Sequence, residues 1–247
     1  PEASPLTAVR SSFASPAPPP SANGAGVRPP PYEPAASGWD EAVDPTGASR
    51  AHWHLFLRSM ADLGMPELTR RWRDAQHLIR ENGVTYNVYG DPSGSARPWQ
   101  LDPIPLLISP ADAEVMEVGL VQRARLLELI CDDLYGKQRL IAEGLLPPEL
   151  AFANPGFLRP CHGIQLPGNR RIHLYGANLG RRPDGSWFVL GDRTQGPSGA
   201  GYALENRIVL ARTFPEAFRD CRVHRLALFF RTLRDTLRGL ALRNKDN

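Results

Sequence analysis

Apolar residues recur at helical spacing in two adjacent segments near the start of the patterned part of the chain. Gly64 separates the two runs, and Pro66 suits the first turn of the second, where a backbone N–H is not needed. Gly83 follows the second run, and glycine is the residue that most often caps a helix end. The pattern predicts helices over 50–63 and 66–83, with apolar positions at Trp53, Phe56, Leu57, Met60, Leu63, Leu68, Trp72, Ala75, Leu78 and Ile79.

A longer helical pattern begins after Ser109 and Pro110. Ser109 is a good N-cap residue, and the apolar periodicity continues to Tyr135, just before Gly136. We predict a short helix over 137–143 and two further helices over 202–212 and 223–240. The last carries arginines away from its apolar face, which we interpret as a solvated surface.

The β patterns are fewer. Residues 84–89 (VTYNVY) are rich in β-branched and aromatic residues and lie between glycines, so they are predicted to form a strand. Residues 172–179 and 186–192 flank the turn 182–185 (RPDG), where Asp184 and Gly185 are expected to supply positive φ angles. This predicts an antiparallel hairpin.

Composition divides the chain into three parts. Residues 1–37 are rich in Pro, Ala and Ser and cannot bury enough apolar surface to offset the entropy of ordering, so we expect a disordered tail. The alternative for this tail is a polyproline ligand for an SH3-like partner. Residues 38–240 are patterned as globular structure, and the polar end 241–247 is expected to be disordered.

Charge and cysteine content bound the function. The net charge of the 247-residue chain is only +3, and no basic block interleaved with aromatics appears, which argues against nucleic acid as a partner. Cys131, Cys161 and Cys221 are widely spaced, without a pair or cluster at zinc-binding spacing. With no apolar run of membrane-spanning length, we expect a reduced, cytoplasmic protein that does not bind membranes.

The segment 190–207 (LGDRTQGPSGAGYALENR) joins the second hairpin strand to a helix through a Gly-rich turn. Backbone N–H groups of such a turn, together with a helix N-terminus, can bind phosphate. The same glycines would also suit a plain strand-to-helix connection that needs positive φ angles. The residues of this segment, taken alone, leave both interpretations open.

Five segments resemble, in order, the circularly permuted type 2 branch of the ATP-grasp superfamily, whose members are often labelled DUF404 or alpha-E-associated ATP-grasp proteins. The resemblance covers most of residues 39–240. Its segments are WDEAVDPTGASRAHW at 39–53, NGVTYNVYGDPSGSARPWQLDPIPLLI at 82–108, LVQRARLLELICDDLYGKQRLIAEGLLPPEL at 120–150, NPGFLRPCHG at 154–163 and DRTQGPSGAGYALENR at 192–207.

The resemblance implies a fold that clamps ATP and couples a carboxylate to an amine through an acyl phosphate. We therefore expect an α/β fold, of α+β character within this segment: a partial ATP-grasp-like fold with a helical N-terminal layer and an antiparallel hairpin leading into a Gly-rich turn and helix. The resemblance further implies ATP and Mg²⁺ as cofactors, a small peptide or amino-acid substrate, and a longer full protein with a C-terminal half or an associated alpha-E domain. The alternative function is a catalytically degenerate domain that binds an anionic ligand or a protein partner.

In ATP-grasp proteins, an acid on the first hairpin strand and an E-x-N pair ending the second hold the metal. Here these positions fall on Asn178, Gly191 and Arg193, which disfavours Mg²⁺ at this place. Asp192 alternates with them and should point to the opposite strand face, unless an irregular strand end turns it inward. The nucleotide-binding residues that the resemblance implies are Asn178, Asp192, Arg193, Gln195, Ser198, Gly199 and Arg207.

Other candidates are weaker. Glu205 could pair with Arg207 and orient it toward a phosphate. The strand residues Tyr86, Asn87, Tyr89 and Asp91 could line the mouth of a pocket, although a buried strand is the favoured interpretation. Catalytic and metal-binding residues cannot be assigned from the sequence.

Overall fold

The computed structural model describes residues 38–86 and 97–241. The predicted disordered tail 1–37 lies outside these ranges, as does the predicted disordered end 241–247 except for its first residue, Ala241. Asn87, Tyr89 and Asp91 also lie outside them. Within the described residues the chain is a mixture of helices and short antiparallel strands, as the α+β expectation requires.

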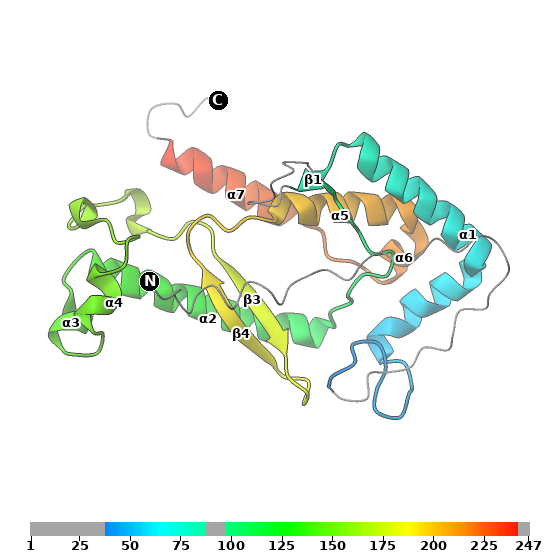
Figure 1. The fold of residues 1–247 in the computed structure, drawn as a ribbon, viewed down its shortest axis with the longest axis horizontal. Helices are drawn as coiled ribbons and strands as arrows, with labels where there is room; N and C mark the ends of the chain where they lie inside the picture. Colours follow the sequence, from blue (N-terminus) through cyan, green and yellow to red (C-terminus); the bar gives the residue numbers. More distant parts are fainter. Residues whose placement is uncertain (1–37, 87–96, 242–247) are drawn as a thin grey trace, which may run out of the picture. The chain divides into compact units, whose positions relative to one another are not determined.

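The first helical region is bent at the glycine that the sequence singles out. A 3₁₀ turn over Ala51–Trp53 leads into α1 (His54–Glu81). Gly64 interrupts α1 with a φ of 70° and a ψ of 161°, and Figure 1 shows the two helical stretches meeting at this bend. Gly83 follows with a φ of 66°. Glycine adopts these backbone angles without strain, which explains why it stands at both positions. The two predicted helices are confirmed, one on each side of Gly64.

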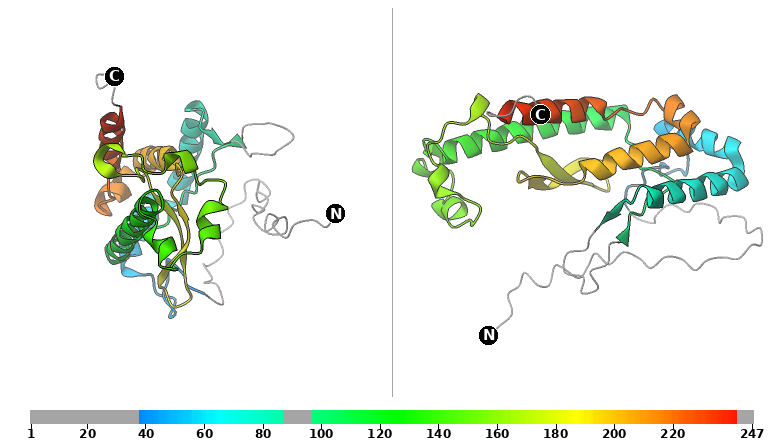
Figure 2. Two further views of the ribbon diagram at one scale, coloured as in Figure 1. Left: turned by 90° about the vertical axis from the view of Figure 1, so that its left-hand side faces the viewer. Right: turned by 90° about the horizontal axis from the view of Figure 1, so that it is seen from above.

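A single long helix, α2 (Pro110–Leu134), runs unbroken in both views of Figure 2. Ser109 caps it as predicted, since its hydroxyl accepts a hydrogen bond from the backbone N–H of Asp112 at 3.1 Å. Two short helices follow, α3 (Arg139–Ala142) and α4 (Pro148–Phe152), and then 3₁₀ turns over Arg159–Cys161 and Pro167–Asn169. The sequence pattern did not predict α4, a helix of one and a half turns.

Two hairpins supply the strands. β1 (Thr85–Tyr86) pairs with β2 (Arg97–Pro98), and β3 (Gly176–Arg181) pairs with β4 (Trp187–Arg193), both antiparallel. The second hairpin has a bulge: Asn178 pairs with Gly191 but Leu179 pairs with Val189, which leaves Leu190 as an extra residue. Its turn closes with a hydrogen bond from the Arg182 N–H to the Ser186 carbonyl.

Two details of this hairpin correct the prediction. The sequence predicts positive φ angles at both Asp184 and Gly185, but within the turn only Gly185 has one. The reason is the loop length: three residues lie between Arg182 and Ser186, and such a loop needs one glycine in the left-handed conformation. The first strand begins at Gly176 and not at Ile172. Glu128 on α2 accepts the backbone N–H groups of Arg171 and Ile172, at 2.6 and 2.8 Å, so these groups are engaged by a side chain.

The last part of the chain is helical: α5 (Ala200–Thr213), α6 (Pro215–Asp220) and α7 (Ala227–Leu240). The core lies where α1 packs against α5 and α6. Its two clusters of buried residues are Trp53, Phe56, Phe214 and Ala217, and Ala75, Ile79 and Val209. The apolar stripes predicted for the two N-terminal helices thus face the C-terminal helices.

Arg181 joins the second hairpin to α2 and to the segment before α1. Its guanidinium contacts both carboxylate oxygens of Glu41 (3.0 and 2.9 Å) and both of Asp112 (3.0 Å each). It also donates to the Gly185 carbonyl and lies over the Trp187 ring. The side chain is only 9% exposed. Hydrogen bonding to Arg181 lowers the pKa of Asp112 to about 2.

This pKa predicts how stability depends on pH. The pKa of Asp112 is lower in the folded than in the unfolded protein, so its stabilisation is complete above about pH 4 and is lost as the pH falls toward 2. A shift of this size corresponds to roughly 2 kcal/mol. Asp112→Asn should remove that part of the acid-induced loss, measured by urea unfolding at pH 2, 3, 4 and 7. Asp74→Asn, at an exposed carboxylate on α1, is the control; equal pH profiles for the two variants would contradict the assignment.

Candidate functional site

Asp192 lies near the end of β4 and is fully engaged by residues of this chain. Its carboxylate accepts two hydrogen bonds from Arg123 on α2, both at 2.7 Å, and a third from the Tyr175 hydroxyl at 2.7 Å. The hydrogen bonds from Arg123 and Tyr175 hold the pKa of Asp192 below its usual value. Burial and the bond to Asp192 raise the pKa of Tyr175 to about 12. Asp192 is therefore an ionised anchor between α2 and the hairpin.

Arg193 and Asn178 lie on the other face of the hairpin. Asn178 pairs with Gly191 and Gly176 pairs with Arg193, whereas Asp192 pairs with Ala177. Arg193 donates from Nε to the Asn178 amide oxygen at 3.2 Å, and its side chain is exposed. The structure thus brings two of the three strand residues together and separates Asp192 from them, as side-chain alternation predicts.

The Gly-rich turn runs from Thr194 to Gly199 and opens α5. Gly196 and Gly199 have φ angles of 54° and 113°, which accounts for glycine at both positions. Within the described residues, no side chain caps α5, and no acceptor meets the backbone N–H groups of residues 198–201. Ser198 and Gly199 are exposed. These four N–H groups thus have no acceptor among the described residues, and they lie at the positive end of a 14-residue helix.

Gln195 lies against a second turn that precedes the hairpin. A Cβ placed on Gly156 would come within 3.0 Å of the Gln195 side-chain nitrogen and 3.1 Å of the Asn154 amide oxygen. Asn154 itself accepts the Gly156 N–H at 2.8 Å. The NPG turn at 154–156 and the Gly-rich turn are thus neighbours, a contact that the sequence did not reveal.

An aromatic cluster fixes the first turns of α5 against the β1–β2 hairpin. Trp99 stacks on Tyr202 with ring centroids 4.3 Å apart, and Tyr86 meets Trp99 edge-on. Trp99 Nε1 donates to the Asn206 amide oxygen at 2.7 Å, and the Tyr202 hydroxyl donates to the Thr85 carbonyl at 2.8 Å. The exposed N-terminus of α5 is therefore set on a rigid support.

Arg207 lies two turns into α5. Within the described residues it makes no ion pair; it lies over the Phe218 ring, and burial lowers its pKa. The expectation that Glu205 pairs with Arg207 is wrong, because Glu205 accepts a hydrogen bond from the side chain of Asn82, the residue that follows α1. Arg207 is thus a half-buried cation without a carboxylate partner among the described residues.

These residues do not suit a divalent cation. Gly191 has no side chain, the Asn178 oxygen faces an arginine, and both oxygens of Asp192 accept hydrogen bonds from arginine. Hard cations need oxygen ligands free of competing positive charge. Across residues 38–86 and 97–241, no group of three or more His, Cys, Asp and Glu side chains could hold a metal ion. The arrangement instead suits an anion.

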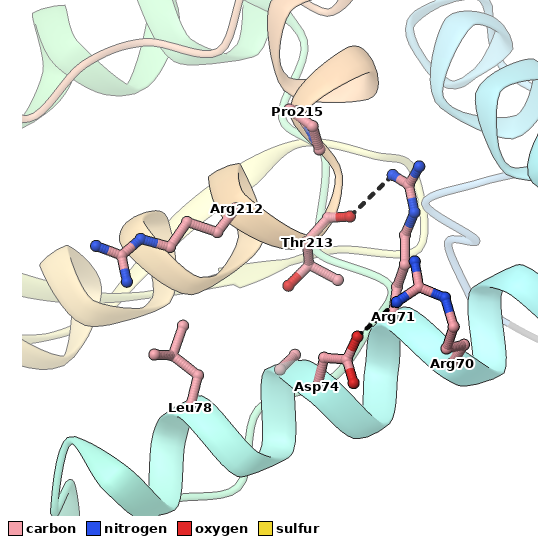
Figure 3. A pocket seen from close by; sticks show the side chains of 8 residues that line it. Arg70, Arg71, Asp74, Leu78, Arg212, Thr213 and Pro215 are labelled. Carbon is pink, nitrogen blue, oxygen red and sulfur yellow. Dashed lines mark hydrogen bonds and ion pairs between the residues drawn. The ribbon is translucent and has the colours of Figure 1, made fainter.

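Arginines also line a shallow hollow of about 310 Å³ between α1 and the end of α5. Arg71 donates to Glu216 and to the Thr213 carbonyl, and Arg70 to Asp74. Figure 3 shows Arg212 extending away from both of them. The charges of Arg70 and Arg71 are neutralised by Asp74 and Glu216, and Arg212 does not converge with them, so the Gly-rich turn is the better anion site.

Arg123 and Tyr175 are functional-site neighbours that sequence reasoning missed. Arg123 belongs to a motif quoted for the family resemblance, but its partner lies 69 residues away in the chain.

Cys161 and His162, adjacent in sequence, do not form a catalytic pair: His162 hydrogen-bonds through Nε2 to the Gly136 carbonyl. Within the part of the chain that the structure describes, no helix has both the length and the hydrophobicity to span a membrane.

Comparison with known proteins gives a consistent picture. The circularly permuted ATP-grasp type 2 family matches residues 105–247. An uncharacterized protein of Mycobacterium tuberculosis, Rv2567, is 41% identical over 206 residues, covering 80% of this chain and 23% of the relative. A Synechocystis protein, sll0335, is 35% identical and covers 82% of this chain and 42% of the relative.

A further relative has a name that carries a function. A Frankia alni protein provisionally named glutamate–cysteine ligase 2-3 is 36% identical over 208 residues, covering 83% of this chain and 23% of that protein. The chain thus spans between about a quarter and two fifths of the length of these relatives.

Proposed function

Because this chain belongs to the circularly permuted ATP-grasp type 2 family, we propose that it is the part of an ATP-dependent carboxylate–amine ligase that binds the phosphates of ATP. The observation that carries the proposal is the exposed N-terminus of α5, where the N–H groups of residues 198–201 have no acceptor among the described residues. Helix N-termini of this kind bind phosphate oxygens. Gln195, Ser198 and Gly199 line this end of the helix.

Arg193 adds an exposed positive charge next to the turn. Among the described residues its one side-chain hydrogen bond goes to a neutral amide, so the guanidinium keeps donors for a phosphate. We assign Asn178 the role of orienting Arg193, and Asp192 the role of fixing the strand end through Arg123 and Tyr175. Arg207 supplies a second cation on α5, which a phosphate could approach without displacing a carboxylate.

The proposed reaction joins a carboxylate to an amine. The carboxylate of an amino acid or small peptide attacks the γ-phosphate, giving an acyl phosphate and ADP, and an amine then displaces inorganic phosphate to form the amide. The name of the Frankia relative favours a γ-glutamyl type of substrate. The N–H groups and Arg193 would stabilise negative charge on the transferring phosphoryl group. Since the residues described here do not suit Mg²⁺, its ligands would come from another part of the protein, such as a C-terminal half. A cytoplasmic setting, with ATP abundant, fits this reaction.

The second candidate is a catalytically degenerate domain that binds an anion or a protein partner. The observation that favours it is the same unsuitability for a metal, above all the glycine at position 191. This candidate needs the α5 site for binding but not for phosphoryl transfer. An associated alpha-E domain would be one such protein partner.

Titration calorimetry tests the phosphate site. We expect this chain to bind ATP with similar affinity in Mg²⁺ and in EDTA, because the contacts are N–H groups and arginine. Arg193→Ala should weaken binding about tenfold or more, the usual effect of losing a hydrogen bond to a charged group. Arg182→Ala, an exposed arginine on the same hairpin, is the control and should bind as the wild type does.

The outcomes separate the candidates. Absence of ATP binding by this chain would overturn its role as the phosphate-binding part. Binding that requires Mg²⁺ would show that metal ligands are present after all and would contradict the degenerate alternative. Equal losses in the Arg193 and Arg182 variants would mean that general positive charge, and not the Gly-rich turn, attracts the nucleotide.

A further inference from the structure

Helix α2 is apolar on two opposite faces, and this chain covers only one of them. The first face is half-buried and carries Met116, Leu120, Ala124, Leu127 and Cys131. On the other side five large apolar side chains are between 45% and 67% exposed: Val115, Val118, Val121, Leu126 and Leu129. None of the 25 residues of α2 is fully buried. We call the second set the α2 stripe.

The α2 stripe runs along most of the helix, with Gln122 and Arg125 between its members. At about 100° of rotation per residue its five members fall within a sector of roughly 140°, and at 1.5 Å rise per residue it is about 21 Å long. A helix at the surface of a protein normally has a polar outer face, and apolar residues all round are the mark of a helix covered on both sides. An exposed apolar surface of this extent marks an interaction site.

We infer that the α2 stripe is the surface on which the remaining part of the ATP-grasp protein packs. The length of the relatives argues for this occupant, because the matched stretch makes up only 23% to 42% of them. Arg125 lies within the stripe, is exposed, and has no acidic partner among the described residues. The occupant should therefore present an apolar surface with a carboxylate opposite Arg125. This inference rests on the proposed ligase function only for the identity of the occupant.

Packing at this place would also bear on the phosphate site. Arg123 lies on α2 among the stripe residues in sequence and holds Asp192 with two hydrogen bonds of 2.7 Å. Asp192 is followed directly by Arg193 and the Gly-rich turn. A partner seated on the α2 stripe would thus be connected to the strand end that precedes the phosphate-binding turn through one ion pair.

The test is co-expression of this chain, carrying an affinity tag, with the portion of the Synechocystis relative that lies outside its matched segment. We expect a one-to-one complex by size-exclusion chromatography with light scattering, in the absence of nucleotide. The double variant Val118→Glu/Leu129→Glu should lower the yield of complex at least tenfold. Its fold should be intact, because both side chains are about two-thirds exposed; circular dichroism and urea unfolding check this. Leu150→Glu, on α4 with a 66% exposed side chain, is the matched control.

Each outcome decides the inference. A complex that the α2 variant loses and the Leu150 variant keeps would support it. No complex with the wild-type chain, or a complex that tolerates the α2 variant, would overturn it. If the wild-type chain forms a dimer by itself that the α2 variant abolishes, the stripe joins two copies and the occupant is wrong. Because nucleotide is left out, failure here is independent of the ATP titration, which tests the proposed function.

Discussion

Replacing Arg181 with alanine is expected to lower the free energy of unfolding by about 3 kcal/mol or more. The guanidinium is 9% exposed and is the shared partner of Glu41 and Asp112, so its loss leaves two carboxylates facing one space without a cation. Breaking a buried ion pair from one side costs more than the pair contributes, because the remaining charges stay desolvated. Urea unfolding at pH 7 measures the change.

The adjacent Arg182 provides the control for this variant. It is exposed, lies over the Phe188 ring and contacts Ser186, so Arg182→Ala should cost under about 1 kcal/mol. The stability difference between the two variants should shrink below pH 4, because protonation of Asp112 removes one of the two unpaired carboxylate charges in the Arg181 variant. Equal stabilities of the two variants at pH 7 would show that the pairing of Glu41 and Asp112 with Arg181 contributes little.

Gly185→Ala is the second substitution for which we expect a large loss, roughly 3 kcal/mol. Two costs add. Gly185 has a φ of 85°, which alanine adopts only with strain, and an added Cβ would overlap the Trp39 ring atoms Cζ3, Cε3 and Cη2. Trp39 is itself held by Arg50, whose guanidinium lies 3.7 Å from the ring centroid, so the ring cannot move aside freely.

Gly47 separates the two costs. Its φ is 84°, almost the same as that of Gly185, but a Cβ there would meet nothing within 4 Å. Gly47→Ala should therefore cost about 1 kcal/mol, the backbone part alone. In a Trp39→Ala background, Gly185→Ala should fall to the same value. A loss at Gly185 that persists without Trp39 would refute the steric explanation.

The features that the sequence could predict are those with local causes. Gly64 and Pro66 mark the bend of α1 because positive φ and a missing N–H are properties of single residues. Ser109 marks the start of α2 because its hydroxyl reaches only a few residues ahead. The face occupied by Asp192 follows from strand alternation, which also has a range of two residues.

What could not be predicted depends on contacts between distant segments. Arg181 meets Glu41 across 140 residues, and Arg123 meets Asp192 across 69. No periodicity encodes such pairs, since each member also looks like an ordinary surface charge. The pairing of Glu205 with Asn82 instead of Arg207 has the same cause: Asn82, at the end of α1, is far away in the chain but is the side chain that Glu205 meets. The candidate site is thus predictable as a turn, but not in its supports.

The bulge at Leu190 decides which charge faces which side of the hairpin. Trp187 and Val189 pair with Arg181 and Leu179, while Asp192 pairs with Ala177, so an even-numbered residue shares a face with odd-numbered ones. The extra residue thus reverses which positions of β4 face α2 after the bulge. It lets Arg181 and Asp192 both reach α2, and it turns Arg193 outward. A regular ladder that kept Leu190 and paired it with Asn178 would exchange the two directions, turning Arg193 toward the side of Arg123 and Asp192 toward the opposite face: the one unpaired residue sets the polarity of the site.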